Sequence, residues 1–338
     1  MGSFLHRHRS AIPYLLLAPG LLWLVLFYVY PSFQMLITSF WSGTLETGFT
    51  FSLSNWTTYP EALERYSTQF GRSILYSATA TLLTLLIAYP LAYAIAFRGG
   101  RYKNLMLFLV VAPFFTSFLL RTISWKIILG DDGLVLGPIK DLGFLDPGFR
   151  VLATPIAVIS GITYNFLPFM TLPIYVSLEK MDRRLTEAAE DLYAGPWRPG
   201  GTIAGAIGGG IVGALMGFSF DFSLLPAIAT GAIVGGVGGT LFLNEAFVRV
   251  TLPLSLPGVF AGSLLVLIPA MGDYVNATLL GNPSTNMIGN VIQSRFLTNA
   301  DYPTASALSF MLMIGILAVV AVYARALGTE NLTAGRGA

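Results

Sequence analysis

The sequence contains no cysteine, only two histidines and few charged residues. Charged side chains make up 11% of its 338 residues, whereas a soluble domain usually carries about 25%. An ordinary soluble protein is therefore excluded. Without cysteine there is neither a disulfide framework nor thiolate chemistry, and His6 and His8 both lie in a short polar N-terminal segment. These absences argue against catalysis by Cys, by His or by a His-ligated metal.

Long apolar blocks take the place of charge. Hydrophobic residues make up 54% of the chain, and the mean hydropathy is +0.70. The blocks have the length of about 20 residues that a helix needs to cross about 30 Å of hydrocarbon. Because lipid offers no partner for unpaired backbone groups, we predict an all-α, polytopic helical bundle. Six spans are expected, at residues 12–40, 74–97, 105–128, 152–176, 257–275 and 305–324.

The basic residues predict the orientation of these spans. Most of the 19 Lys and Arg residues fall on segments that are cytoplasmic if both termini are cytoplasmic. Arg7 and Arg9 precede a long first span with no small-residue cleavage site, which predicts an uncleaved anchor. The outer segments are net acidic, which would mildly attract cations. The alternative is that this asymmetry reflects the insertion rules alone.

A Gly-rich apolar stretch, residues 200–242, is divided by Asp221 and Pro226 into two arms of near-spanning length. We interpret it as a helical hairpin, because linkers are usually polar and Ser-rich. The chain is thus divided into a membrane core, residues 1–197 and 245–338, and an insert, residues 198–244. Glycines four residues apart form one stripe on each arm, where two backbones can approach closely. These glycines are Gly201, Gly205, Gly209, Gly213, Gly217, Gly231, Gly235 and Gly239.

Some signals of other functions fail in context. Residues 208–213 formally fit G-x-G-x-x-G, but no strand precedes them. The sequence has no G-x-x-x-x-G-K-[ST] motif, so ATP hydrolysis by the P-loop route must belong to a separate polypeptide. A membrane-embedded enzyme would need clustered polar residues inside spans, and a nucleic-acid-binding protein would need a basic-aromatic surface. Neither pattern is present in the sequence.

The segment Glu187-Ala188-Ala189-Glu190-Asp191-Leu192 lies on the predicted cytoplasmic side, and Leu252-Pro253 and Pro257-Gly258 follow beyond the insert. Its alanines allow close packing, and Glu187 and Asp191 lie one helical turn apart, where they can meet basic groups of a partner. This pattern resembles the EAA loop of binding-protein-dependent ABC importer permeases. In that family the loop is a cytoplasmic coupling helix that binds the ATPase subunit. The resemblance assigns this role to Glu187, Ala188, Ala189, Asp191, Leu192, Leu252 and Pro253.

The chain departs from the family pattern at two places. Tyr193 stands where the family usually has glycine, and the insert separates Trp197 from Phe247. We expect the insert to leave and re-enter at the same cytoplasmic point, so that both halves of the loop still meet. The alternative is that the insert packs elsewhere and docks an additional subunit or lipid.

A second resemblance narrows the subfamily. It is carried by residues 113–122 with Trp125, by 167–173, and by 272–281. These segments are similar to permeases of spermidine/putrescine importers, although relatives with similar signatures carry opines, aminophosphonates or ferric ion. The resemblance implies a type I (MetI-like) permease in a bacterial inner membrane. It further implies a second permease subunit, two ATP-binding subunits that hold ATP and Mg, and an extracytoplasmic solute-binding protein, with no cofactor in this chain.

A polyamine path needs carboxylates that pair with ammonium groups, and aromatic faces for cation–π contacts. Asp273 and Tyr274 fit this requirement at the end of a span, and Trp125, Tyr164 and Phe169 would join them if the bundle folds as in the family. Alternatively, Asp273 caps a helix and the aromatic residues are interfacial anchors.

Arg121 is a gate candidate, because a charge at the edge of a span must reach water, headgroups or an acid. Asp131 and Asp132 are its possible partners, and snorkelling is the alternative. A stand-alone secondary transporter or channel is the remaining rival function; it would be favoured by two inverted halves with ionisable residues near mid-membrane.

Overall fold

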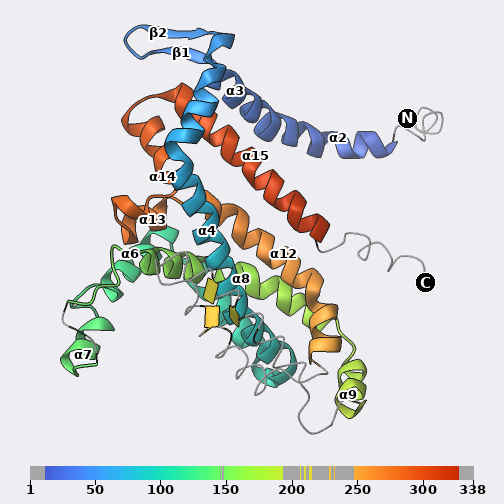
Figure 1. Ribbon diagram of the computed structural model, residues 1–338. Coiled ribbons are helices and arrows are strands. Elements are labelled where there is room, and N and C mark those ends of the chain that lie inside the picture. Colours follow the sequence, from blue (N-terminus) through green and yellow to red (C-terminus); the bar gives the residue numbers. More distant parts are fainter. Residues whose placement is uncertain are drawn as a thin grey trace. The chain divides into compact units, whose positions relative to one another are not determined.

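A computed structural model describes residues 12–144, 146, 148–192 and 247–326, together with residues 206, 209–210, 213–214, 228–229 and 232. Within this part of the chain the secondary structure is helical apart from one short β-hairpin, which confirms the predicted helical architecture (Figure 1). The chain divides into two compact units. Unit 1 comprises residues 1–67 and 291–317, and unit 2 comprises residues 68–290 and 318–338.

In unit 1, the helical segment Leu16–Ser39 is apolar, and none of the residues in its apolar 18-residue window is buried within the chain. Such exposure is expected where the neighbours are lipid or another subunit. A two-stranded antiparallel sheet follows, in which Trp41 pairs with Phe51 and Thr44 with Gly48. Gly43 and Gly48 have positive φ beside the hairpin turn. The elements are α2 (Ile12–Leu24), η1 (Val25–Val29), α3 (Tyr30–Ser39), β1 (Trp41–Thr44), β2 (Gly48–Phe51), η2 (Leu53–Thr57) and η8 (Ser294–Thr298).

Two long helices, α4 (Thr58–Tyr93) and α15 (Tyr302–Ala326), begin in unit 1 and end in unit 2. The remaining described elements of unit 2 are η3 (Ala94–Arg98), η4 (Gly100–Tyr102), α5 (Lys103–Val111), η5 (Ala112–Phe115), α6 (Phe118–Ile128), α7 (Leu136–Asp141), α8 (Pro155–Glu179), α9 (Arg183–Leu192), η6 (Phe247–Thr251), α12 (Leu252–Met271), α13 (Val275–Leu280) and η7 (Pro283–Thr285). The short helix α14 (Ile288–Gln293) lies at the boundary between the units.

The number of candidate spans in the structure agrees with the number predicted from the sequence if one bent pair of helices counts as a single span. Five described helical segments are long and apolar enough to cross a membrane, and a sixth is added if one bent pair counts as a single span. The predicted span at residues 105–128 corresponds to this bent pair, in which the chain turns by 95° between Phe115 and Phe118. Thr116 adopts an extended conformation, with φ −97° and ψ 151°, and so interrupts the helix.

The fifth predicted span is displaced along the chain. It was expected at residues 257–275, but its helical segment runs from Phe247 to Met271. Pro257 therefore lies inside the helix and does not begin it. Gly272 terminates α12, and the chain then turns into the short helix α13.

The core of unit 2 is built on the contact between α8 and α12, which lie side by side (Figure 1). Two glycines of α12, one helical turn apart, make this contact close. A Cβ atom at Gly258 would lie 2.5 Å from the carbonyl oxygen of Pro173, and one at Gly262 would lie 2.9 Å from the sulfur of Met170. Ile162, Met170, Ile174, Val266 and Ala270 are fully buried around them. Small residues thus allow two backbones to meet where lipid supplies no hydrophobic driving force.

In the insert, the described residues belong to two helical stretches. Gly210 of the first faces Ile228 and Ala232 of the second, since a Cβ atom there would lie 3.7 Å from the Cβ of Ala232. Gly209 and Gly213 of the predicted stripes are helical. The other stripe positions, Gly201, Gly205, Gly217, Gly231, Gly235 and Gly239, lie outside the described residues, as do the boundaries at 198 and 244.

We expect Gly258→Ala to destabilise the protein. The added methyl group would overlap the backbone of Pro173, and overpacking of this kind costs about 1–3 kcal/mol. Gly315→Ala is the matched control, because Gly315 also lies within a helix but has no atom within 4 Å of the new Cβ. Thermal unfolding in detergent measures both variants. An equal melting temperature for the two would contradict the packing argument.

Candidate functional site

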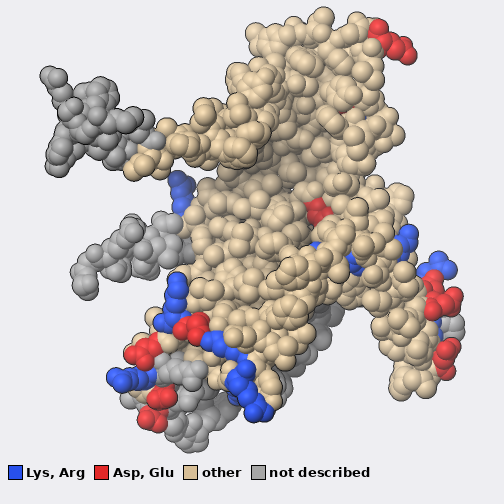
Figure 2. Space-filling model, turned by 180° about the vertical axis from the view of Figure 1, so that it is seen from behind, with Lys and Arg blue, Asp and Glu red and all other residues tan. Residues whose placement is uncertain are grey.

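The predicted coupling segment forms α9, a helix of ten residues at one end of unit 2. Glu187, Ala188 and Asp191 are exposed, whereas Ala189 is 6% exposed. The helix therefore presents acidic side chains to the outside and packs against the rest of the chain through Ala189. Figure 2 shows charged side chains gathered around α9, at the lower left of that view. Leu192 ends the helix.

The second half of the coupling segment meets the first half. Helix α9 contacts η6, although the insert separates them in the chain. Leu252 and Pro253 follow directly as the first residues of α12, and Pro253 is exposed. Both halves of the predicted loop thus lie together, as expected if the insert leaves and re-enters at one point.

The element η6 is attached to the bundle by aromatic contacts. The ring of Phe247 lies 5.4 Å from that of Tyr89 and 6.1 Å from that of Tyr93, both on α4. The hydroxyl of Tyr89 is also 2.7 Å from that of Ser255 in α12. The end of the bundle that adjoins α9 is therefore fixed to α4 as well as to α8.

An ion pair ties α5 to the end of α8, four residues before α9 begins at Arg183. The ammonium group of Lys103 pairs with the carboxylate of Glu179 and lies 5.4 Å from the ring centroid of Tyr175. Through this contact, the chain that enters α9 is held to the start of the bent span.

Asp273 lies in the turn between α12 and α13 and is 8% exposed. Its Oδ1 accepts hydrogen bonds from the backbone N–H groups of Val275 (2.9 Å) and Asn276 (3.1 Å), and its Oδ2 accepts one from the side chain of Asn276. Burial raises the pKa of the Asp273 carboxyl, while these three hydrogen bonds act in the opposite direction. The carboxylate therefore caps α13, which is the alternative that the sequence left open.

A buried polar network extends from Asp273 across three helices. The amide nitrogen of Asn165 in α8 donates to the side-chain oxygen of Asn276 (3.1 Å) and to the hydroxyl of Thr122 in α6 (3.1 Å). Asn165, Asn276 and Thr122 are at most 1% exposed. Sequence reasoning missed all three, although single polar residues inside apolar spans are a signal of such networks.

The aromatic path candidates form two edge-on pairs. The rings of Trp125 and Tyr164 lie 5.3 Å apart, and Phe169 lies 4.9 Å from Phe114. Tyr164 and Phe114 line a common pocket of about 360 Å³. Tyr274, beside Asp273, is 43% exposed. The structure thus brings Trp125, Tyr164 and Phe169 to one region of unit 2.

Arg121 lines the same pocket, and it does not form the ion pair that the sequence offered as one alternative. Its guanidinium carbon lies 4.6 Å from the ring centroid of Phe114 and 5.8 Å from that of Phe118. Among the described residues, Asp131 instead pairs with Arg150 (3.0 Å) and Lys140 (3.7 Å). Of the two alternatives that the sequence left open, the ion pair of Arg121 with Asp131 is not formed, because bases beyond α6 hold that acid.

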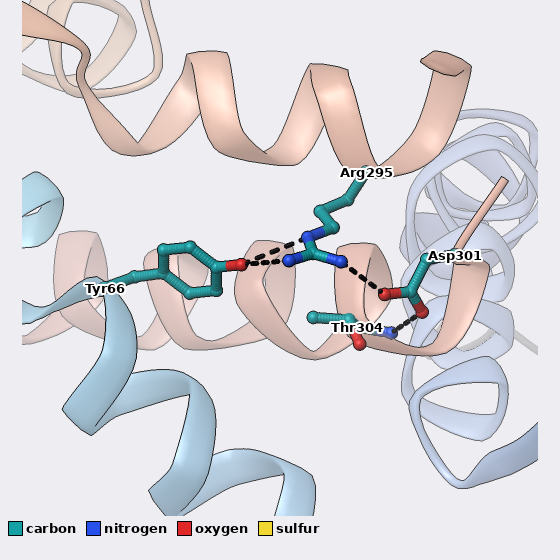
Figure 3. Close-up of polar contacts among 4 residues, drawn as sticks. All are labelled: Tyr66, Arg295, Asp301 and Thr304. Carbon is teal, nitrogen blue, oxygen red and sulfur yellow. Dashed lines mark hydrogen bonds and ion pairs between the residues drawn. The ribbon is translucent and has the colours of Figure 1, made fainter. Parts of the chain in front are cut away.

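A second polar cluster, in unit 1, was also missed. The guanidinium of Arg295 donates to the hydroxyl of Tyr66 (3.1 Å from Nε) and pairs with Asp301 (3.2 Å), which also accepts from the backbone N–H of Thr304 (Figure 3). Tyr66 is the point at which α4 departs from helical geometry, with φ −113° and ψ 16°. The cluster joins the beginnings of α4 and α15 at this irregularity.

The fold and the coupling segment define a class, the multi-pass permease subunits of ABC importers. Curated relatives agree and are more specific. The spermidine/putrescine transport system permease protein PotB of Haemophilus influenzae is 35% identical over 312 residues, which cover 90% of each chain. PotB of Escherichia coli strain K12 is 33% identical over 307 residues, covering 90% of this chain and 94% of the relative. This chain belongs to the family of spermidine/putrescine transport system permeases, which confirms the resemblance seen in the sequence.

More distant comparisons fit this placement. The inner membrane ABC transporter permease protein YdcU of Escherichia coli is 25% identical over 349 residues, covering 97% of this chain and 93% of the relative. A crystal structure of a bacterial ABC transporter that imports the polysaccharide alginate contains a chain with the same fold, at TM-score 0.56 and 17% identity over 97% of this chain and 98% of that one. No protein-family model matches the chain.

We expect Asn165→Leu to lower the thermal stability of the protein. The substitution removes the amide that donates to both Asn276 and Thr122, and interhelical hydrogen bonds in membranes contribute about 0.6–2 kcal/mol. Ser160→Ala is the control, because Ser160 lies on the same helix but bonds only to the carbonyl of Ala157 in its own turn. Unfolding followed by circular dichroism in detergent compares them. Unchanged melting of Asn165→Leu would show that the network contributes nothing.

Proposed function

We propose that this chain is the membrane-spanning subunit of an ATP-driven importer for polyamines such as spermidine and putrescine. It pairs with a second permease subunit to enclose the path, two ATP-binding subunits hold ATP and Mg, and an extracytoplasmic solute-binding protein delivers the substrate. The observation that carries this proposal is the junction of α9 with η6, which presents Glu187 and Asp191 at the surface and connects them to the core.

The coupling segment acts as a lever in this proposal. Closure of the ATP-binding subunits displaces α9, and the displacement passes through η6 into α12. Helix α12 moves together with α8, because Gly258 and Gly262 keep the two helices in close contact. The chain performs no covalent chemistry; it converts nucleotide binding into a different balance between inward-facing and outward-facing conformations.

We propose that the substrate path borders the aromatic pairs. Trp125, Tyr164 and Phe169 offer ring faces to ammonium groups, in contacts of about 0.5–2 kcal/mol each. Tyr274, which follows Asp273 in the sequence, is exposed. Asp273 belongs to the path by its position next to Tyr274 and not as a free carboxylate, because its carboxylate oxygens already accept three hydrogen bonds from its own chain.

We further propose that the protein lies in the bacterial inner membrane with both termini cytoplasmic and that residues 198–244 form a hairpin insert. The distribution of Lys and Arg supports the orientation. The contact of Gly210 with Ile228 and Ala232 supports the hairpin.

The importer is tested by copurification and by reconstitution. We expect an ATPase and a second permease to be recovered with the chain, and ATP-driven uptake of labelled spermidine by the complex in proteoliposomes. An isolated chain that transports alone would favour the secondary transporter. Uptake of an opine, aminophosphonate or ferric ion in place of polyamines would reject the substrate class and keep the importer.

Charge reversal in the coupling helix should uncouple transport. Glu187→Lys places a cation where the proposal puts an acidic contact to the ATPase, and we expect uptake to fall by roughly tenfold or more. Glu64→Lys, an equal reversal at an exposed position of α4, is the control and should leave uptake unchanged. The readouts are spermidine uptake and the amount of ATPase that copurifies. If both variants behave like the wild type, Glu187 does not contact the motor.

The orientation can be tested directly because the natural chain has no cysteine. We expect Glu187→Cys to react with a membrane-impermeant maleimide only in inverted vesicles, and Thr47→Cys, in the hairpin turn, only in intact spheroplasts. Both positions are exposed, so that failure to react reflects sidedness. Labelling of Glu187→Cys from the outside would overturn both the topology and the coupling role.

A further inference from the structure

Arg121 is surrounded by aromatic rings and has no acidic partner among the described residues. Its guanidinium lies over Phe114 and within 5.8 Å of Phe118, and its buried Nε has no hydrogen-bond partner. Cation–π contacts are thus the attractive interactions that hold this charge in place.

The pocket around Arg121 is almost entirely apolar. It has a volume of about 360 Å³ and is lined by residues of α4, α5, η5, α6 and α8, including Phe114, Tyr164 and Pro168. Arg121 is the one formally charged group among its lining residues. The rings of Phe169 and Trp125 pack on Phe114 and Tyr164 respectively and so extend the aromatic wall.

The position of the pocket along α8 places it away from both ends of that helix. Tyr164 is about 22 Å from Glu179 and about 14 Å from Pro155 at 1.5 Å per residue. A charge at such a depth is costly, and charged residues there usually face a cavity or a pathway. Arg121 also follows closely after the 95° break between Phe115 and Phe118.

We propose that Phe114, Phe118 and Tyr164 form a seat for an alkylammonium group, and that Arg121 is a tethered cation that occupies this seat when no substrate is present. An ammonium group of the polyamine takes the seat when Arg121 leaves it, so that the arginine and the substrate compete for the same ring faces. The inference rests on the proposed function and adds to it a binding site and a residue that controls access to it.

The test measures binding of labelled spermidine to the complete, nucleotide-free complex in nanodiscs without the solute-binding protein. We expect Arg121→Gln and Arg121→Met to bind spermidine roughly tenfold more tightly than the wild type, because a tethered competitor has been removed. Arg121→Lys should bind like the wild type, because its ammonium group can occupy the same seat. The gain in Arg121→Gln should disappear when Phe114→Leu is added.

Lys126→Gln is the matched control, since it removes one positive charge from an exposed position of the same helix. It should leave binding unchanged. An equal gain in Lys126→Gln, or a gain that survives Phe114→Leu, would show a general charge effect and overturn the seat. No gain in either Arg121→Gln or Arg121→Met, with melting temperatures close to that of the wild type, would overturn it as well.

The same comparison with labelled butylammonium separates this inference from the proposed function. Tighter butylammonium binding by Arg121→Gln, together with absence of ATP-driven spermidine uptake by the wild type, would reject the polyamine importer and keep the seat. Wild-type spermidine uptake with no change in butylammonium binding would reject the seat and keep the importer.

Discussion

The close contact between α8 and α12 is the constraint on which the rest of unit 2 depends. Lipid tails are as apolar as leucine side chains, so two helices gain little by burying apolar surface against each other and must instead approach closely. Gly258 and Gly262 provide this approach, because they bring the backbone of α12 against Pro173 and Met170. Once α12 is fixed, so is η6, which continues into it and contacts α9. In the proposed mechanism the coupling segment therefore acts on a closely packed helix pair, and not on a single span.

Hydropathy predicted where the chain crosses the membrane but not how it crosses. The number of spans follows from composition, because the free energy of burial in lipid depends on the length and apolarity of a segment. The bend after Phe115 could not be predicted from composition. Thr116 and Ser117 do not by themselves indicate a break in a helix, and apolar composition contains no information about the direction of the helix. Pro257 was a misleading signal for a similar reason. Proline is disfavoured inside most helices, but membrane helices tolerate it, and α12 continues through it.

The functional residues were predictable to the extent that their chemistry is local. The predicted coupling motif could be recognised because its alanines and acids are adjacent in sequence, and the structure shows that its two halves are in contact. The network of Thr122, Asn165 and Asn276 was missed, because the hydrogen bonds of Asn165 that join the three residues connect positions more than forty residues apart in the sequence. Proximity in sequence made Asp131 one possible partner of Arg121, but Arg150 pairs with Asp131 from the far side of α7. Such competition is decided by tertiary structure.

The surroundings of Asp273 and Arg121 fit the proposed substrate path, because such a path must also release its substrate. The carboxylate oxygens of Asp273 accept three hydrogen bonds from its own chain, and the guanidinium of Arg121 lies over ring faces. These two residues therefore present no free carboxylate on which a polyamine with several ammonium groups could be trapped. Transport requires binding that is favourable enough for entry and weak enough for exit. Aromatic faces, at about 0.5–2 kcal/mol per contact, meet this requirement better than a desolvated carboxylate, whose attraction for an ammonium group at low dielectric is several times larger. The scarcity of charge seen in the sequence is thus compatible with a cation path, since such a path needs ring faces in series more than it needs acids.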